Sequence, residues 1–325
     1  MIISRTPFRI SFVGGGTDFK EFYTHRAGSV VSTAIDKYVY VIVNRKFGDE
    51  VRVSYSQNEI VAHVSQVRHD IIREALTLYG ITGGIEVVVV SDLPLRGVGT
   101  GLGASSSLAV GVLHALAAFK KIPVTPRKLA EDACRVEIDI LGRPAGKQDQ
   151  YAAAFGRLNY MQFYPDERVD VVTVPVSPDI HAILESNLLL FHTGTDTKSS
   201  VVLNEQKKRT SQNMSMLQAM VCLAQETQED LRSGRMTLGQ ALHENWMHKR
   251  NLASQISNAM IDSFYEKARA AGASGGKILG SGGGGFLLLY CEPEHHAHVR
   301  KALSGLREMH FRFERTGSLI VYNDE

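Results

Sequence analysis

Cysteine, long apolar runs and excess charge are all scarce in this chain of 325 residues. The three cysteines, Cys134, Cys222 and Cys291, are odd in number and far apart, which argues against a disulfide framework and indicates a reducing compartment. No 18 consecutive residues are apolar, and MIISRTPFRI does not have the pattern of a secretory leader. The net charge is +2 without an outstanding basic run, which argues against a nucleic-acid partner. We therefore expect a soluble, cytoplasmic protein without membrane contact.

The length of the chain exceeds what one ordinary core occupies, so we expect two domains. Hydrophobic residues make up 44% and charged residues 22%, which is typical of globular proteins. Ser177 and Pro178 interrupt the pattern within Val176–Asp179, and we therefore predict domains over residues 1–180 and 181–325. Strands and helices mix without regular alternation, which favours an α+β fold in each domain.

The most informative stretch is Pro94–Leu108, where glycines occupy every second position before a run of serines. An apolar, β-branched run over Ile85–Val90 precedes it, and an apolar run to Phe119 follows it, which predicts a buried strand, a loop and a helix. Glycines allow close backbone approach and a helix N-terminus offers free N–H groups, so this order favours phosphate binding. The residues concerned are Gly97, Gly99, Gly101, Gly103, Ala104, Ser105, Ser106 and Ser107.

Two familiar phosphate loops do not fit this stretch. No lysine follows the glycines, as a P-loop requires, and the spacing departs from the GxGxxG of dinucleotide sites. A flexible turn with a serine as helix N-cap is the alternative that the loop alone leaves open. Two further glycine motifs elsewhere in the chain favour the phosphate site.

Regular hydrophobic spacing predicts further elements along the chain. On a helix that starts at Pro126, with Thr125 as its N-cap, and ends before Gly142, Glu137 lies at the edge of the buried face, where a carboxylate can point inward. The other expected elements include a strand at Ile2–Val13, paired strands at Tyr38–Asn44 and Val51–Tyr55, helices at Glu59–Tyr79 and Val201–Arg232, and a C-terminal hairpin of His310–Phe313 with Leu319–Tyr322.

Three motifs stand in order along the chain: RTPFRISFVGGGTD at Arg5–Asp18, the loop at Pro94–Ser107, and KILGSGGGGF at Lys277–Phe286. Together they resemble the galactokinase, homoserine, mevalonate and phosphomevalonate kinase (GHMP) superfamily over nearly the whole chain. The resemblance implies an N-terminal domain like ribosomal protein S5, a ferredoxin-like C-terminal domain, and ATP and Mg²⁺ as cofactors. In that superfamily the second motif cradles the ATP phosphates, and the third closes the site.

Within the superfamily, RISFVGGGTD, GKQDQYAAAFG and TGTDTKSS resemble bacterial sugar-1-kinases that act on D-glycero-D-manno-heptose 7-phosphate. This branch implies phosphorylation of the anomeric hydroxyl to a 1,7-bisphosphate for nucleotide-activated heptose synthesis. Two alternatives stay open: a kinase for an unphosphorylated sugar such as fucose or galactose, and a catalytically silent sensor of sugar and ATP. The sequence departs from the usual pattern at Ala104, where a serine is typical, and at Lys198, where an arginine is typical.

The matched motifs also imply residue roles. Asp149 would be the base for the sugar hydroxyl and Arg9 the cation at the transferred phosphoryl group; a helix cap and a solvated arginine are their alternatives. Glu137 and either Ser105 or Ser106 would hold Mg²⁺, unless Glu137 is an exposed helix residue. A sugar or sugar phosphate is the expected partner, and a homodimer stays open. The implied substrate-binding residues are Gly15, Gly16, Thr17, Asp18 (alternatively a helix N-cap), Lys198, Gly283 and Gly284.

Overall fold

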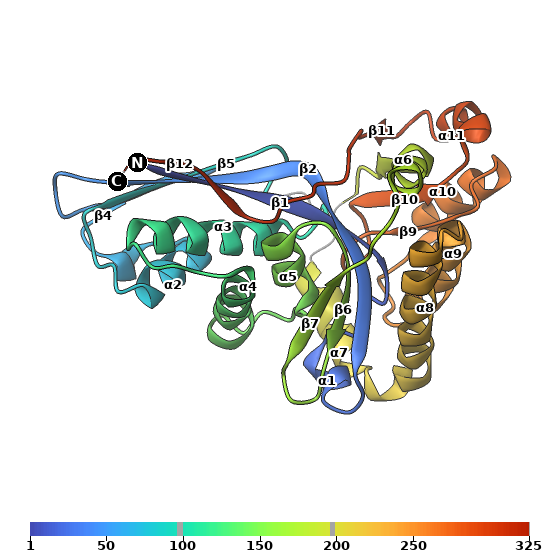
Figure 1. Cartoon of the computed structure of the whole chain (residues 1–325), viewed down its shortest axis with the longest axis horizontal. Helices are drawn as coiled ribbons and strands as arrows, with labels where there is room; N and C mark the ends of the chain where they lie inside the picture. Colours follow the sequence, from blue (N-terminus) through green and yellow to red (C-terminus); the bar gives the residue numbers. More distant parts are fainter. Residues whose placement is uncertain (96–99, 196–198, 325) are drawn as a thin grey trace.

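The computed structural model describes residues 1–95, 100–195 and 199–324. Two β-sheets with helices packed against them make up the molecule (Figure 1). The larger sheet has the order β12–β1–β2–β5–β3–β4, and β6 pairs with β2 and β7 with β6. Its strands are β1 (Ile2–Val13), β2 (Gly28–Arg45), β3 (Val51–Ser54), β4 (Asn58–Val61), β5 (Ile85–Ser91), β6 (Leu158–Phe163), β7 (Val169–Thr173) and β12 (Leu319–Asn323).

Strand β2 spans 18 residues and holds the larger sheet together. Its first part, Gly28–Thr33, pairs with β6, and its second part, Val39–Arg45, pairs with β5. Strand β1 runs antiparallel beside it from Ile2 to Val13, as the sequence predicts for that strand. The end of β1 therefore lies in the interior of the fold, and Gly14–Asp18 continues directly from it.

Helices α3 and α5 pack on one face of the larger sheet, and α2 and α4 pack on α3 (Figure 1). Helix α3 is buried nearly all round, which confirms the central position that its apolar sequence predicts. Gly111 permits its close approach to β1, because a Cβ there would lie 2.9 Å from Thr6 Oγ1. The helices of this half are α1 (Lys20–Tyr23), α2 (Asp70–Leu78), α3 (Ala104–Phe119), α4 (Pro126–Cys134) with a π-helical continuation (Arg135–Ile140), and α5 (Gln148–Phe155), with a 3₁₀ turn at Val64–Gln66.

The smaller sheet has the order β11–β8–β10–β9. Alternate residues of β8 face opposite sides, so Leu188 and Leu190 join the core of the larger sheet while Leu189 and Phe191 join a second core. Its strands are β8 (Leu188–His192), β9 (Gly275–Ile278), β10 (Phe286–Tyr290) and β11 (Arg307–Glu308). The helices of this half are α6 (Pro178–Asn187), α7 (Ser199–Lys208), α8 (Met214–Ser233), α9 (Leu238–Lys249), α10 (Ala259–Ala270) and α11 (His296–Ala302), with 3₁₀ turns at Ser211–Asn213 and Pro293–His295.

The helix predicted over Glu59–Tyr79 is wrong in its first half, because Asn58–Val61 forms β4 and α2 begins only at Asp70. Glu59 explains the difference. Its buried carboxylate accepts the backbone N–H groups of Arg68 and His69 and the hydroxyl of Tyr55. These bonds satisfy backbone groups in a loop and so replace helical hydrogen bonds.

Two strand pairings and one helix also differ from the prediction. Strand β3 pairs with β4 and, in parallel, with β5 rather than with β2. The C-terminal hairpin does not form, because β12 pairs with β1 of the larger sheet, and the ends of the chain lie together (Figure 1). The helix predicted over Val201–Arg232 is divided into α7 and α8 by a turn at Ser211–Asn213. Such partners depend on tertiary packing, which local hydrophobic spacing does not encode. Within the described ranges, no helix combines the length and apolarity that crossing a membrane requires.

Candidate active site

The described part of the glycine loop leads directly into α3. Gly101 and Gly103 have φ angles of +69° and +76°, a conformation that favours glycine. A Cβ at Gly101 would lie 2.4 Å from the carbonyl oxygen of Leu279, so the loop touches the third glycine motif here. Gly103 is the N-cap of α3 and no side chain caps the helix, so the serine-cap alternative is wrong. Gly97 and Gly99 lie outside the described residues.

A pocket of about 400 Å³, the loop pocket, surrounds the start of α3. The free N–H groups at this helix end and the loop backbone make it a suitable site for an anion. Ser107 does not line it, because its hydroxyl donates a hydrogen bond to the carbonyl oxygen of Pro7. The lining residues include Thr100, Gly101, Gly103, Ala104, Ser105, Ser106, Glu137, Arg143, Ser199 and Ser200.

Glu137 is buried in the π-helical turn after α4, so the alternative of an exposed helix carboxylate is wrong. Its carboxylate accepts hydrogen bonds from the hydroxyls of Ser105 and Ser106, the latter at 2.6 Å. It also accepts the Gln150 amide at 2.8 Å and the Arg143 guanidinium at 3.2 Å. One carboxylate and two hydroxyls thus converge beside the anion site.

This donor set fits Mg²⁺, which prefers oxygen ligands and usually keeps waters while binding one or two carboxylates and substrate phosphates. In the described ranges, no cluster of three or more His, Cys, Asp or Glu side chains could hold a metal. A magnesium ion at Glu137 would therefore complete its coordination with nucleotide phosphate and water. Glu137, Ser105 and Ser106 are the residues that could hold it.

Arg9 and Asp149 form a two-pronged ion pair. Nε and Nη2 of Arg9 each donate to one oxygen of Asp149 at 2.8 Å, and Nη1 donates to the carbonyl oxygen of Gly101 at 2.6 Å. The Arg9 side chain is 4% exposed and that of Asp149 is 26% exposed, so the carboxylate is the part that faces open space. Neither a solvated arginine nor a helix-capping aspartate describes this pair, since Asp149 lies within α5 and contacts Arg9.

Asp18 lies in a second, smaller pocket of about 80 Å³, the aspartate pocket, which Gly15, Gly16, Gln148 and Asp149 also line. Its carboxylate accepts the backbone N–H groups of Gly16 (2.8 Å) and Gln148 (3.2 Å) and the Gln148 side-chain amide (3.1 Å). These bonds do not cap α1, whose N-cap is Phe19. Burial raises the pKa of Asp18 above its usual value, the N–H of Gly16 opposes this shift, and the nearby Asp149 charge adds to it.

Lys249, at the end of α9, is a buried cation that lines the aspartate pocket and was not predicted from the sequence. Its Nζ donates to the carbonyl oxygen of Gly280 at 2.5 Å and so joins α9 to the third glycine motif. Burial and the charge of Arg9 lower the pKa of Lys249 to about 8. Gln206 of α7 and Ser281 also line the pocket. The hydrophobic spacing in HENWMHKRNL predicts only an amphipathic helix and does not show that its lysine points into a pocket.

Other residues predicted for substrate binding lie elsewhere. Thr17 is buried, and its hydroxyl donates to the carbonyl oxygens of Gly14 and Ser29, which joins the turn after β1 to β2. The N–H of Gly283 bonds to Ile256, and a Cβ at Gly284 would lie 2.3 Å from the carbonyl oxygen of Thr195. From this motif, Gly280 and Ser281 line both pockets. Lys198 lies outside the described residues.

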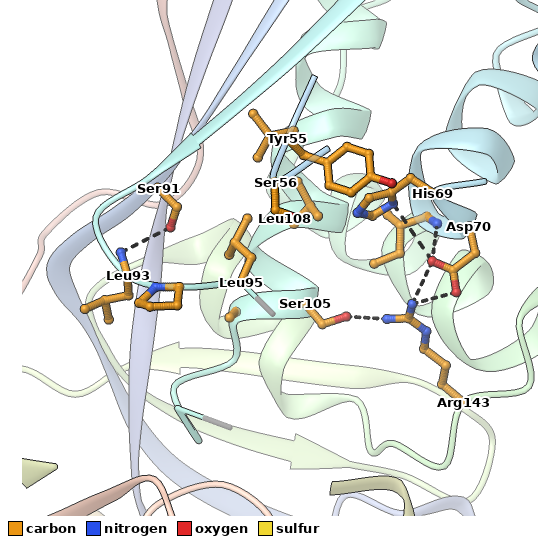
Figure 2. A pocket seen from close by; sticks show the side chains of 14 residues that line it. Tyr55, Ser56, His69, Asp70, Ser91, Leu93, Leu95, Ser105, Leu108 and Arg143 are labelled. Atoms are coloured by element: carbon orange, nitrogen blue, oxygen red, sulfur yellow. Dashed lines mark hydrogen bonds and ion pairs between the residues drawn. The ribbon is translucent and has the colours of Figure 1, made fainter. Parts of the chain in front are cut away.

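A third pocket, the Tyr55 pocket, has a volume of about 440 Å³ and adjoins the loop pocket. Figure 2 shows Tyr55, His69 and Arg143 on one side of it and Ser91 and Leu93 on the other, with Arg143 reaching Ser105 and Asp70. The two pockets share Leu95, Ala104, Ser105 and Arg143. The loop pocket is therefore the neighbour of both the Tyr55 pocket and the aspartate pocket, because it shares lining residues with each.

Two family models match the chain: the N-terminal domain of GHMP kinases over residues 62–157 and their C-terminal domain over residues 227–309. The D-glycero-alpha-D-manno-heptose 7-phosphate kinase of Campylobacter jejuni is 30% identical, over 93% of each chain. The galactokinase of Pyrococcus furiosus is 24% identical, over 98% of this chain and 97% of that one. A solved structure of a D-glycero-D-manno-heptose 1-phosphate kinase from Bacteroides thetaiotaomicron has a TM-score of 0.82, with 24% identity and full coverage of both chains.

The fold of the last structure agrees with the two sheets described above, and the likeness to the first relative extends over nearly the whole length of both proteins. The expected two-domain architecture is thereby confirmed. This chain belongs to the GHMP kinase family, and it is an ATP-dependent sugar kinase.

Proposed function

We propose that this kinase phosphorylates D-glycero-D-manno-heptose 7-phosphate at the anomeric hydroxyl to give the 1,7-bisphosphate. The observation that carries the proposal is the Arg9–Asp149 pair, which lies where the loop pocket and the aspartate pocket meet. An ATP phosphate in the first pocket and a sugar hydroxyl in the second would meet at this pair. The residues that line both pockets are Arg9, Ala145, Asp149, Leu203, Gly280 and Ser281.

In this proposal, Asp149 accepts the proton of the sugar hydroxyl as that hydroxyl attacks the γ-phosphorus. Arg9 supplies a permanent positive charge beside the transferred group, and its bond to Gly101 holds it at the mouth of the loop pocket. A magnesium ion held by Glu137 and either Ser105 or Ser106 would neutralise phosphate charge when bound. The free N–H groups at the start of α3 orient the phosphates.

The aspartate pocket would hold and orient the sugar. Asp18 is fixed by three hydrogen bonds and can accept sugar hydroxyls, while Lys249 offers a cationic donor in the same pocket. Asp149 can then act on one hydroxyl only, because the others are engaged elsewhere. This division of labour supports transfer to a single position of the sugar.

The relative from Campylobacter jejuni supports a heptose 7-phosphate as the substrate. A 7-phosphate requires a cation away from the reacting hydroxyl, and Lys198 in TGTDTKSS is the candidate that the sequence offers. Ser199 and Ser200, which directly follow it, begin α7 and line the loop pocket, and Gln206 of the same helix lines the aspartate pocket. The galactokinase relative makes an unphosphorylated sugar the second candidate.

A substrate panel tests the proposal. The purified chain is given Mg·ATP with heptose 7-phosphate, the unphosphorylated heptose, fucose and galactose, and ³¹P NMR identifies the phosphorylated position. We expect turnover with heptose 7-phosphate and a new phosphate at C1. A higher kcat/KM on fucose or galactose, or a product phosphorylated elsewhere, contradicts the proposal.

The role of Lys198 is tested in the same assay. Lys198→Ala should raise the KM for heptose 7-phosphate about 10-fold, as expected for a lost charge-assisted hydrogen bond, with little change on an unphosphorylated sugar. Lys208→Ala, on the exposed last turn of α7, is the matched control and should leave both values unchanged. Equal losses on both sugars would place Lys198 elsewhere in the site.

A further inference from the structure

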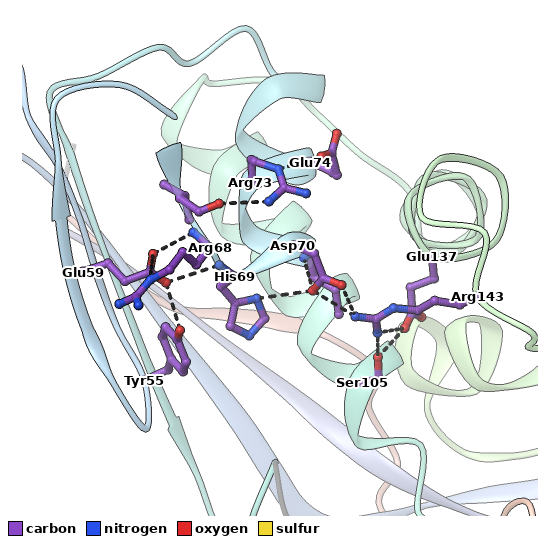
Figure 3. A network of polar contacts seen from close by, with 12 residues as sticks. Tyr55, Glu59, Arg68, His69, Asp70, Arg73, Glu74, Ser105, Glu137 and Arg143 are labelled. Atoms are coloured by element: carbon purple, nitrogen blue, oxygen red, sulfur yellow. Dashed lines mark hydrogen bonds and ion pairs between the residues drawn. The ribbon is translucent and has the colours of Figure 1, made fainter. Parts of the chain in front are cut away.

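Arg143 lies between two acidic groups that belong to different elements. Its Nη2 donates to both carboxylate oxygens of Asp70, at 2.9 and 2.8 Å. Its Nη1 donates to the hydroxyl of Ser105 and, at 3.2 Å, to Glu137 (Figure 3). One guanidinium thus connects the start of α2 with Glu137 and Ser105, two of the three groups that could hold magnesium.

The Asp70 end of this arrangement is firmly held. Asp70 is the first residue of α2, and the loop before it is fixed by Glu59, whose side chain is almost fully buried. Glu59 accepts the N–H of Arg68 at 2.6 Å, the N–H of His69 at 3.2 Å and the hydroxyl of Tyr55 at 2.9 Å (Figure 3). The network therefore extends from the wall of the Tyr55 pocket to Ser105.

The Glu137 end is held differently. Among the described residues, Arg143 is the cation that the structure records in ion-pair contact with this buried carboxylate, and an uncompensated charge there would be costly. Magnesium at Glu137 would take over this compensation. A guanidinium and a divalent cation on the same carboxylate oxygen would repel each other, which favours release of Arg143 from Glu137 when the metal binds.

We propose that Arg143 changes partner when the magnesium nucleotide binds: it keeps Asp70, releases Glu137 and Ser105 to the metal, and donates to the nucleotide's phosphate oxygens. Arg143 lines both the Tyr55 pocket and the loop pocket, so a nucleotide that occupies both must pass its guanidinium (Figure 2). The planar guanidinium of Arg143 can donate to a carboxylate along one edge and to phosphate oxygens along the other. This inference rests on the proposed position of phosphates and metal.

Calorimetric binding of two probes tests the proposal. The probes are Mg²⁺ with the non-hydrolysable ATP analogue AMPPNP, and adenosine, which lacks phosphates. Arg143→Met should weaken Mg·AMPPNP binding about 10-fold or more and change adenosine binding less than about 2-fold, since only the charged contact is lost. Equal losses for both probes, or no loss for either, would overturn the proposal.

Arg73→Met is the matched control. Arg73 lies on α2 one turn from Asp70, its side chain is 29% exposed against 30% for Arg143, and it bonds Glu74 and Val67 outside the pockets. It should leave both affinities unchanged. If Arg143→Met does not fold, Arg143→Lys takes its place. It keeps the positive charge but cannot bind two groups with a planar guanidinium, so we expect an intermediate loss of Mg·AMPPNP affinity.

Asp70→Asn separates positioning from direct contact. It should weaken Mg·AMPPNP binding about 3-fold in the wild-type background and have no further effect in Arg143→Met, because its influence acts through Arg143. Additive losses would overturn the link between the two residues. Gly103→Val separates failure of this inference from failure of the proposed function. If Gly103→Val leaves Mg·AMPPNP affinity unchanged, the phosphates lie elsewhere and the proposed function fails. If Gly103→Val loses Mg·AMPPNP affinity but Arg143→Met does not, only the present inference is contradicted.

Discussion

The loop pocket and the aspartate pocket are neighbours that share Arg9 and Asp149, yet they are constructed differently. The loop pocket presents backbone N–H groups at the start of α3, and its buried carboxylate, Glu137, has a cationic partner. The aspartate pocket places Asp18 and Asp149 with Arg9 and Lys249 around about 80 Å³. For Asp18 the described part of the chain shows hydrogen bonds from Gly16 and Gln148 but no ion pair.

The two pockets should therefore tolerate different kinds of substitution. The loop pocket depends on backbone shape in addition to the Glu137 cluster, so a side chain added to a glycine should damage it. The aspartate pocket depends on the identity and charge of a few side chains. Substitutions that preserve volume but remove charge should therefore affect the sugar and the chemical step rather than the nucleotide.

The largest effect is expected where the pockets meet. Asp149→Asn keeps the shape and removes the proton acceptor, so kcat should fall about 10²-fold or more while both substrates still bind. Steady-state kinetics with equilibrium binding of each substrate measures this. Asp170→Asn removes another ion-paired aspartate, outside both pockets, and should leave kcat unchanged. Near-normal turnover in Asp149→Asn would rule out the base.

Gly103→Val should break the loop pocket more than the aspartate pocket. Its positive φ is strained for any side chain, and a Cβ would lie 3.2 Å from Arg9 Cγ, so both the loop backbone and Arg9 must move. We expect ATP affinity to fall by more than about 10-fold, and sugar affinity by less. Gly80→Val has a similar φ of +63° and open space around it, so it isolates backbone strain. If both variants bind ATP like wild type, the loop is not the phosphate cradle.

The loop pocket could largely be predicted from the sequence because its parts are local. Gly101 to Ser106 are consecutive, and hydrophobic spacing put Glu137 at the edge of a buried helix face, from which the structure turns it toward Ser105 and Ser106. The π-helical turn that carries Glu137 could not be predicted, and neither could the Arg143–Asp70 bond, whose partners are 73 residues apart. Long-range ion pairs leave no periodic signal in the chain.

The aspartate pocket could be predicted only in part, because it is assembled from β1, α5, α7, α9 and the third glycine motif. Asp18 and Asp149 stand in recognisable motifs, whereas Lys249 and Gln206 come from ordinary amphipathic helices. Their inward direction follows from tertiary packing of α9 against β1 and of Gln206 against Gly16 in the turn after β1. The same reason explains why the partner of β12 was missed.

Lys249→Met tests whether the aspartate pocket binds the sugar through a cation. It removes the charge with little change in volume, and the KM for the sugar should rise about 10-fold with ATP affinity unchanged. The wild-type KM should also rise as pH increases through about 8, where Lys249 loses its proton, and this dependence should disappear in the variant.

Lys277→Met is the control for Lys249→Met. Lys277 is equally enclosed, but its amino group donates to the carbonyl oxygens of Ser11 and Phe12 and does not line either pocket. It should lower the free energy of unfolding, measured by denaturant titration, and leave the KM for the sugar unchanged. If the two lysine variants behave alike in the kinetic assay, Lys249 is structural and does not contact the sugar.

The smallest effects are expected from the two serines that hold Glu137, and they refine the loop pocket itself. Ser106 is buried and bonds one carboxylate oxygen at 2.6 Å, whereas Ser105 is exposed and shares the other oxygen with Arg143. The serine that ligates the metal should lose turnover several-fold when replaced by alanine, and excess Mg²⁺ should restore part of it. Replacing the other should cost only about 1 kcal/mol of unfolding free energy, as a lost hydrogen bond to a buried carboxylate. Magnesium titrations of kcat and denaturant titrations of both variants separate the two cases. Equal losses of turnover and of unfolding free energy in the two variants would mean that Glu137 binds the metal without a preferred hydroxyl.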